Sequence, residues 1–262
     1  MSRHAMSPDE LRSEIQSAVD AIVQETHEAD WSEDFLSLSL VMKVREVLGT
    51  AGGETEPDAA RHSFDLQAYK ITGEAESKHG DIAFVVTRQT LHGPMTGVGF
   101  YEAKASIDGH RYPTFDFRQL QRLCTKTPRL SYLFYSKDGG NAESCDWPTA
   151  VTAHDFPRFK VRTVDANYLR RCRNPNAALH THGLTFGHHF VNRLLSGRDL
   201  DYSRSPENAV KRWLDVTRRA TAIIVSVVVQ DTTLPRIEIH PDCPGYPDAK
   251  RLTFENDRPR LT

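Results

Sequence analysis

Asp81, Glu102 and Lys104 are the ionisable residues whose types and spacing could serve one metal-assisted reaction. Glu102 and Lys104 stand two residues apart in the apolar stretch GVGFYEAKAS. Strand side chains alternate between faces, so this pair shares one face of the predicted strand with Val98 and Phe100. A carboxylate and an ammonium group in a buried strand are costly unless they are paired or used.

Asp81 begins the preceding apolar segment, DIAFVVT. An antiparallel hairpin would bring Asp81 beside the end of the strand that carries Glu102 and Lys104. Two converging carboxylates suit Mg²⁺, with Mn²⁺ as a substitute, and the Ala103 carbonyl can add a third oxygen ligand. Lys104 can orient or activate the attacking water, or stabilise charge on a phosphate. A simple salt bridge between Glu102 and Lys104 at a sheet edge is the open alternative.

The elements that would position these residues begin with two helices. Residues 7–29 carry a cap residue, Ser7, and an apolar stripe at helical spacing. Residues 31–49 predict a second helix, capped by Ser32 and ended by Gly49. Residues 62–72, 81–87 and 98–106 then predict three strands of an antiparallel meander, joined by turns over 73–80 and 88–97.

A further helix and strand complete the predicted core. Residues 114–127 predict a helix with Phe117, Leu120 and Leu123 facing inward, and residues 129–137 predict a strand. The order of helices, three strands, helix and strand predicts an α/β fold with a mixed central β-sheet flanked by helices. The later segments predict a strand within 154–165, helices over 184–197 and 205–220, and a strand over 221–231.

Asp81, followed by Glu102-Ala103-Lys104 across a predicted hairpin, resembles the PD-(D/E)XK nuclease superfamily, which has the restriction-endonuclease-like fold. The resemblance covers a core of about residues 30–140. Glu76 ahead of His79-Gly80-Asp81 is similar to the pattern that precedes the first catalytic aspartate in some members. The departure is Gly80, at a position where proline is typical.

The resemblance also implies supporting residues. Gln119, with Gln121 as the alternative, matches the glutamine that often supports the site from the helix after the catalytic strand. Glu33, with Asp34 next to it, matches the glutamate that many members carry on the first core helix. The set implied as catalytic is therefore Asp81, Glu102, Lys104, Gln119, Glu76 and Glu33, and the set implied as metal-binding is Asp81, Glu102 and Ala103.

The function that the resemblance implies is a Mg²⁺-dependent endonuclease that hydrolyses phosphodiester bonds in DNA, in restriction or antiviral defence. An RNA-directed nuclease stays open, because a hydrolytic metal site reads the phosphate and not the sugar. A non-catalytic module that binds nucleic acid or docks a partner also stays open. Cutting both strands would need two sites, so a homodimer is compatible, as is gating by an activating defence partner.

The basic residues suggest where a polyanion could bind. Residues 1–60 hold 13 acidic and 4 basic side chains, whereas the rest of the chain has a basic excess. Two later segments carry much of this excess and are the candidate phosphate contacts, although charged faces of amphipathic helices are an equal alternative. These candidates are Arg170, Arg171, Arg173, Lys211, Arg212, Arg218 and Arg219.

We expect one domain over residues 1–262, in which an α/β extension over 141–262 completes the sheet or shapes a substrate channel. A small appended recognition domain is the alternative. The four scattered cysteines, the absence of an apolar signal core and the lack of a membrane-length apolar run predict a cytoplasmic protein.

Other chemistry has weaker support in the sequence. The chain lacks the nucleotide-loop and esterase motifs GxxxxGK[ST], GxGxxG and GxSxG. A histidine cluster makes a zinc site conceivable, but no cysteine or acidic residue sits at ligand spacing. Its members are His180, His182, His188 and His189.

Overall fold

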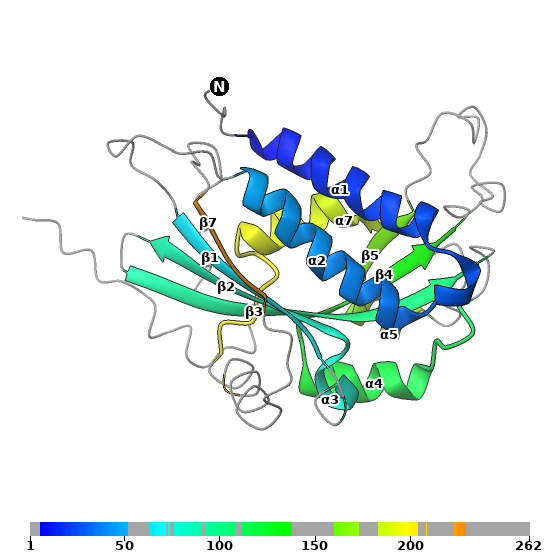
Figure 1. Ribbon diagram of the computed structural model, residues 1–262. Helices are drawn as coiled ribbons and strands as arrows, with labels where there is room; N and C mark the ends of the chain where they lie inside the picture. The colour runs from blue at the N-terminus through cyan, green and yellow to red at the C-terminus, as the bar shows by residue number, and fades with distance from the viewer. Residues whose placement is uncertain are drawn as a thin grey trace, which may run out of the picture.

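A seven-stranded β-sheet runs through the computed structural model, in the order β6-β5-β4-β3-β2-β1-β7 (Figure 1). The structure describes residues 6–51, 63–71, 73, 76–90, 93–107, 112–137, 160–172, 183–203, 208 and 223–228. The strands are β1 Ser63–Lys70, β2 Ile82–Thr90, β3 Gly93–Ser106, β4 Leu130–Ser136, β5 Val161–Asp165, β6 Leu184–Thr185 and β7 Ile223–Val228.

The sheet is mixed, as the sequence predicts. β1, β2 and β3 form an antiparallel meander, whereas β3 and β4 pair in parallel. Parallel neighbours need a crossover connection, and the helix α4, Phe117–Lys126, lies in that connection. The later strands extend both edges, because β5 pairs with β4, β6 with β5, and β7 with β1.

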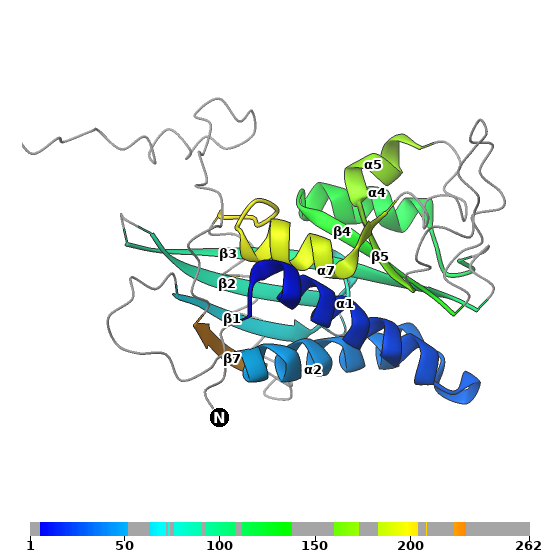
Figure 2. The ribbon, with the colours of Figure 1, turned by 90° about the horizontal axis from the view of Figure 1, so that it is seen from above.

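Helices cover both faces of the sheet (Figures 1 and 2). α1, α2 and α7 lie over one face, and α3, α4 and α5 lie on the other. Each layer buries its own apolar cluster against the sheet, which holds the strands that carry Asp81 and Glu102 between two cores. The helices are α1 Pro8–Glu25, η1 Glu28–Asp30, α2 Glu33–Ala51, α3 Glu76–His79, α4, α5 Ala166–Arg171, α7 Phe186–His189 and η3 Phe190–Leu195.

The N-terminal helices begin where the sequence predicts. Ser7 and Glu10 form a capping box at the start of α1, in which each side chain bonds the backbone N–H of the other residue. The Ser32 hydroxyl accepts a hydrogen bond from the backbone N–H of Phe35, at 3.2 Å, and so caps α2. This cap fixes the first turn of α2, the turn that presents Glu33 and Asp34.

Several local predictions are wrong, including the start of the helix predicted over 184–197, where residues 184 and 185 form β6. Residues 76–79 form the single helical turn α3 within the predicted turn 73–80. α2 continues past Gly49 to Ala51, because glycine favours a helix end but does not impose one. β2 and β3 extend through most of 88–97, where cross-strand pairing outweighs the local turn signals. Phe117 is 37% exposed at the first residue of α4, whereas Leu120 and Leu123 are buried as expected. The predicted helix 205–220 lies outside the described residues, apart from residue 208.

Among the described residues, no helix combines the length and apolar character that crossing a membrane would require. Cys124 and Cys172 are free thiols.

Candidate active site

Asp81 directly precedes β2 and reaches across to β3. The register pairs Ile82 with Tyr101, which places Asp81 beside Glu102. The Asp81 backbone N–H donates to the Tyr101 carbonyl at 2.7 Å, and its Oδ2 accepts from the Ala103 N–H at 2.6 Å. The predicted hairpin therefore brings the carboxylate of Asp81 to the Glu102-Ala103-Lys104 segment.

Gly80 permits this close approach. Its φ of +94° lies in the left-handed region, and a Cβ there would meet the Tyr101 carbonyl oxygen at 2.7 Å. A proline, whose φ is fixed near −65°, does not fit this conformation. The glycine that departs from the family pattern is thus required by the local backbone.

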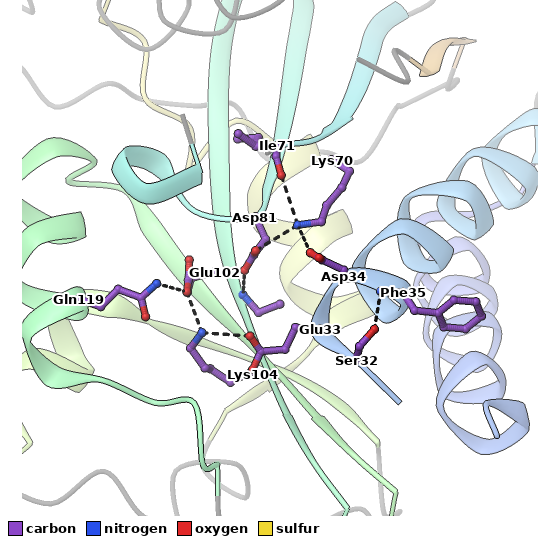
Figure 3. A network of polar contacts seen from close by, with 11 residues as sticks. Ser32, Glu33, Asp34, Phe35, Lys70, Ile71, Asp81, Glu102, Lys104 and Gln119 are labelled. Carbon is purple, nitrogen blue, oxygen red and sulfur yellow. Dashed lines mark hydrogen bonds and ion pairs between the residues drawn. The ribbon is translucent and has the colours of Figure 1, made fainter. Parts of the chain in front are cut away.

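Glu102 and Lys104 point to the same face of β3, as strand alternation predicts, and both are buried. The Lys104 Nζ lies 2.8 Å from Glu102 Oε1. The Gln119 side-chain amide, from α4, donates to the same Glu102 oxygen at 2.7 Å (Figure 3). Gln119, and not the exposed Gln121, is therefore the glutamine that the structure brings to the site.

Glu33 joins the site from the first turn of α2. Its Oε2 lies 3.3 Å from the Lys104 Nζ, and its Oε1 accepts from the Ala105 N–H, also at 3.3 Å. The Thr114 hydroxyl also donates to Glu33 Oε1. Glu33 thus bridges helix, strand and the segment before α4, and it shares Lys104 with Glu102 (Figure 3).

Lys70, the last residue of β1, is a site residue that the sequence analysis missed. Its Nζ lies 2.8 Å from Asp34 Oδ1 and 3.1 Å from Asp81 Oδ1, and it donates to the Ile71 carbonyl at 3.3 Å. The side chain is only 10% exposed. The available signal was a lone lysine at the end of a strand predicted to pair with the one that Asp81 begins.

Three carboxylates from separate elements meet at this end of the sheet. Oxygen atoms of Asp34, Glu76 and Asp81 all lie within 4.8 Å of one another. Among the described residues this is the one group of three such side chains close enough to hold a metal ion. Glu76 from α3 and Asp34 from α2 therefore flank Asp81, whereas Glu102, which the resemblance implies as a metal ligand beside Asp81, is not in this group.

Burial is the largest influence on the pKa values of the ionisable groups at the site. Burial, and next the charge of Asp81, raises the pKa of Glu102 from 4.5 to about 7. Burial also raises the pKa of Glu76, although Lys70 opposes this shift. Burial would lower the pKa of Lys104, but the Glu102 and Glu33 carboxylates outweigh it and raise the pKa, so Lys104 is a cation at neutral pH.

A cavity of about 710 Å³ opens beside these groups. Its lining includes Glu33, Asp34, Glu76 and Asp81, together with Trp31 and the segment around Pro113. These four carboxylates therefore face a space that can admit a ligand, whereas Glu102 and Lys104 are buried and do not line it.

The residues present fit a divalent cation. Oε2 of Glu102 is buried and has no hydrogen-bond partner, which leaves one carboxylate oxygen of a 2%-exposed side chain unsatisfied. Five carboxyl groups surround two ammonium groups, so negative charge is in excess. Hard oxygen donors with an excess of negative charge are the setting that Mg²⁺ and Mn²⁺ prefer. The five are Glu33, Asp34, Glu76, Asp81 and Glu102.

The candidate phosphate contacts are only partly described. Arg170 and Arg171 are exposed near the end of α5 and do not line the cavity. The remaining five candidates lie outside the described residues: Arg173, Lys211, Arg212, Arg218 and Arg219.

The histidine cluster is separate from the acidic site where the structure describes it. His189 is buried against Tyr101, whose hydroxyl lies 2.9 Å from its Nδ1, and its Nε2 lies 3.2 Å from Asp199. His188 lies beside it on α7, while residues 180 and 182 lie outside the described residues. His189 is thus a satisfied core histidine, on the sheet face opposite to Glu102.

Comparison with protein-family models, curated proteins and solved structures gives no significant match for this chain.

The contact between Gln119 and Glu102 leads to a testable prediction. If the site cuts nucleic acid, as the resemblance implies, Gln119→Ala should lower the cutting rate about tenfold, because Glu102 loses a donor that orients its carboxylate. Gln121→Ala is the matched control, since this glutamine is exposed on the same helix. Cutting rates at matched protein and metal concentrations would measure the effect, and equal rates for the two variants would contradict it.

Proposed function

We propose that this chain is a metal-dependent endonuclease with a restriction-endonuclease-like fold, which hydrolyses phosphodiester bonds in DNA. The observation that carries the proposal is the meeting of Asp81, Glu102 and Lys104 at one end of the sheet. Asp81 accepts a hydrogen bond from the Ala103 N–H, and the side chains of Glu102 and Lys104 contact each other directly at 2.8 Å. Figure 3 shows these three side chains together.

In this proposal, Asp81, Glu102 and the Ala103 carbonyl hold Mg²⁺ or Mn²⁺. The unsatisfied Oε2 of Glu102 supports its part in this ligand set. When bound, such an ion supplies a more acidic water and stabilises charge on the phosphate oxygens.

Lys104 acts in this proposal as a cation that faces the scissile phosphate and orients the attacking water. The raised pKa of Lys104 supports this role over that of a proton acceptor. Glu102 and Glu33 hold the ammonium group from two sides, which fixes its position before substrate binds. Gln119 in turn fixes Glu102.

The family resemblance suggests restriction or antiviral defence in the cytoplasm, with DNA as the partner. A homodimer would supply the two sites needed to cut both strands, and a defence partner could gate the activity. The charge asymmetry of the sequence is compatible with a polyanion on one side of the molecule.

A substrate panel tests the proposal. Purified protein would be incubated with plasmid, linear duplex, single-stranded DNA and RNA, each with Mg²⁺, Mn²⁺ or EDTA. We expect metal-dependent cutting of DNA that EDTA abolishes. Preferential cutting of RNA would change the proposed substrate from DNA to RNA, but it would leave the proposed metal-dependent hydrolysis of phosphodiester bonds unchanged. Salt-sensitive DNA binding without cutting in any metal would contradict the enzyme and favour the non-catalytic module.

A further inference from the structure

The Lys70 ammonium group is fully engaged by oxygen atoms of the site. A lysine has three N–H donors. Nζ of Lys70 has three oxygen neighbours, one each from Asp34, Asp81 and the Ile71 carbonyl, at 2.8, 3.1 and 3.3 Å. The side chain is mostly buried, so solvent does not compete strongly for these donors. Lys70 is thus held in place by the acidic group itself.

The Lys70 ammonium group contacts carboxylate oxygen atoms that could otherwise bind a metal ion. Two of its three partners, Asp34 and Asp81, belong to the set of three carboxylates that lie within 4.8 Å of one another. Asp81 is also a proposed metal ligand, and its Oδ2 already accepts one hydrogen bond from the Ala103 N–H. The remaining oxygen, Oδ1, is the one that Lys70 contacts. A cation that binds Asp81 through Oδ1 would therefore share this oxygen with Lys70 or displace the lysine.

We propose that Lys70 is a resident cation, which competes with the divalent ion for Asp81 and Asp34 and so sets the metal affinity of the site. This inference rests on the proposed function, because it assumes that Asp81 binds the ion. Lys70 is a positioning residue in this account: it keeps the acidic group assembled without metal and weakens metal binding through charge repulsion.

The Glu102–Lys104 pair contrasts with this arrangement. Lys104 contacts Glu102 Oε1, which leaves Oε2 of the same carboxylate unsatisfied. Lys104 therefore leaves a free ligand atom on its partner, whereas Lys70 occupies the free oxygen of Asp81. The two lysines of the site thus have different expected effects on metal binding, and Lys70 is the one expected to oppose it.

Calorimetric titration of Mn²⁺ into the full-length chain tests this inference without relying on activity. We expect Lys70→Met to bind Mn²⁺ at least about tenfold more tightly than wild type, because it removes the repulsion and frees Asp81 Oδ1. Lys70→Gln, which keeps a donor but not the charge, should shift in the same direction. Lys43→Met is the matched control, since Lys43 pairs with Glu46 on the exposed side of α2, and it should bind as wild type does.

Thermal melting with and without Mn²⁺ covers the case in which the Lys70 variants fold poorly. Without Lys70 the carboxylates repel one another, so Mn²⁺ should raise the melting temperature of Lys70→Met more than that of wild type. If wild type binds Mn²⁺ and both Lys70 variants bind it equally or more weakly, the proposed role of Lys70 is overturned, but the proposed metal site is not. No binding by any of these proteins would overturn both this inference and the proposed metal site.

Discussion

Lys104→Met is expected to lower the rate of DNA cutting by about 10²–10³-fold, the typical cost of losing one donor that stabilises transition-state charge. The side chain of methionine has nearly the length of lysine and fills its buried position, but it cannot orient water or face a phosphate as a cation. Lys104 lies between Glu102 and Glu33, which have no other cation among their described contacts. Single-turnover cutting at saturating protein would measure the loss.

The control separates chemistry from folding. Lys126→Met makes the same change of side chain at an exposed position on α4, and its cutting should match that of wild type. If the Glu102–Lys104 pair were only a salt bridge at the end of a strand, Lys104→Met would lose stability but cut normally per folded molecule. Normal cutting by folded Lys104→Met would therefore contradict the proposed role.

Glu102→Gln is expected to abolish cutting and yet to stabilise the fold at pH 8. The pKa of Glu102 is raised to about 7 from 4.5, so the folded state favours the neutral carboxyl group. A carboxyl group whose pKa is higher in the folded than in the unfolded state stabilises the fold at pH values below the unfolded-state pKa. This stabilisation is lost as the pH rises from 4.5 through 7. The shift corresponds to at most about 3 kcal/mol at pH 8. At pH 8 we therefore expect Glu102→Gln to raise the free energy of unfolding by about 1–3 kcal/mol, reduced by the weaker contact of glutamine with Lys104.

The pH dependence distinguishes this effect from ordinary repacking. At pH 5 most of the folded protein carries a neutral Glu102, so the gain should fall to about 1 kcal/mol or less. Denaturant unfolding at pH 5 and pH 8 would measure both values. Glu46→Gln, on the exposed side of α2, should show no comparable difference between the two pH values. A loss of stability for Glu102→Gln that is the same at both pH values would contradict the account.

The order of the core elements could be predicted from the sequence because their signals are local. Ser7 and Ser32 cap their helices, and the alternation in β3 places Glu102 and Lys104 on the face that α4 covers. The hairpin that brings Asp81 to Glu102 was predicted from two consecutive apolar segments, residues 81–87 and 98–106. These features depend on neighbours in the sequence, which propensity and periodicity describe well.

The parts that the sequence did not reveal depend on contacts distant in the chain. Lys70 looks like an ordinary strand-end lysine until β1 pairs with β2 and brings it to Asp81. Glu76 and Asp34 were indicated by the resemblance and not by local signals, and they meet because α2 and α3 reach the same end of the sheet from different sides. The extension of β2 and β3 through the predicted turn follows from their pairing with each other, which local turn signals do not describe.

The most direct test of the central claim is a comparison of wild type with Asp81→Asn, in DNA cutting and in DNA binding, at the same Mn²⁺ concentration. Asparagine has the shape of aspartate and can still accept the hydrogen bond from the Ala103 N–H, but it lacks the negative charge that a metal ligand supplies. The account predicts that wild type cuts duplex DNA, and that Asp81→Asn binds it equally well but does not cut it. Cutting by Asp81→Asn at the wild-type rate would contradict the claim that this end of the sheet is a metal-dependent nuclease site.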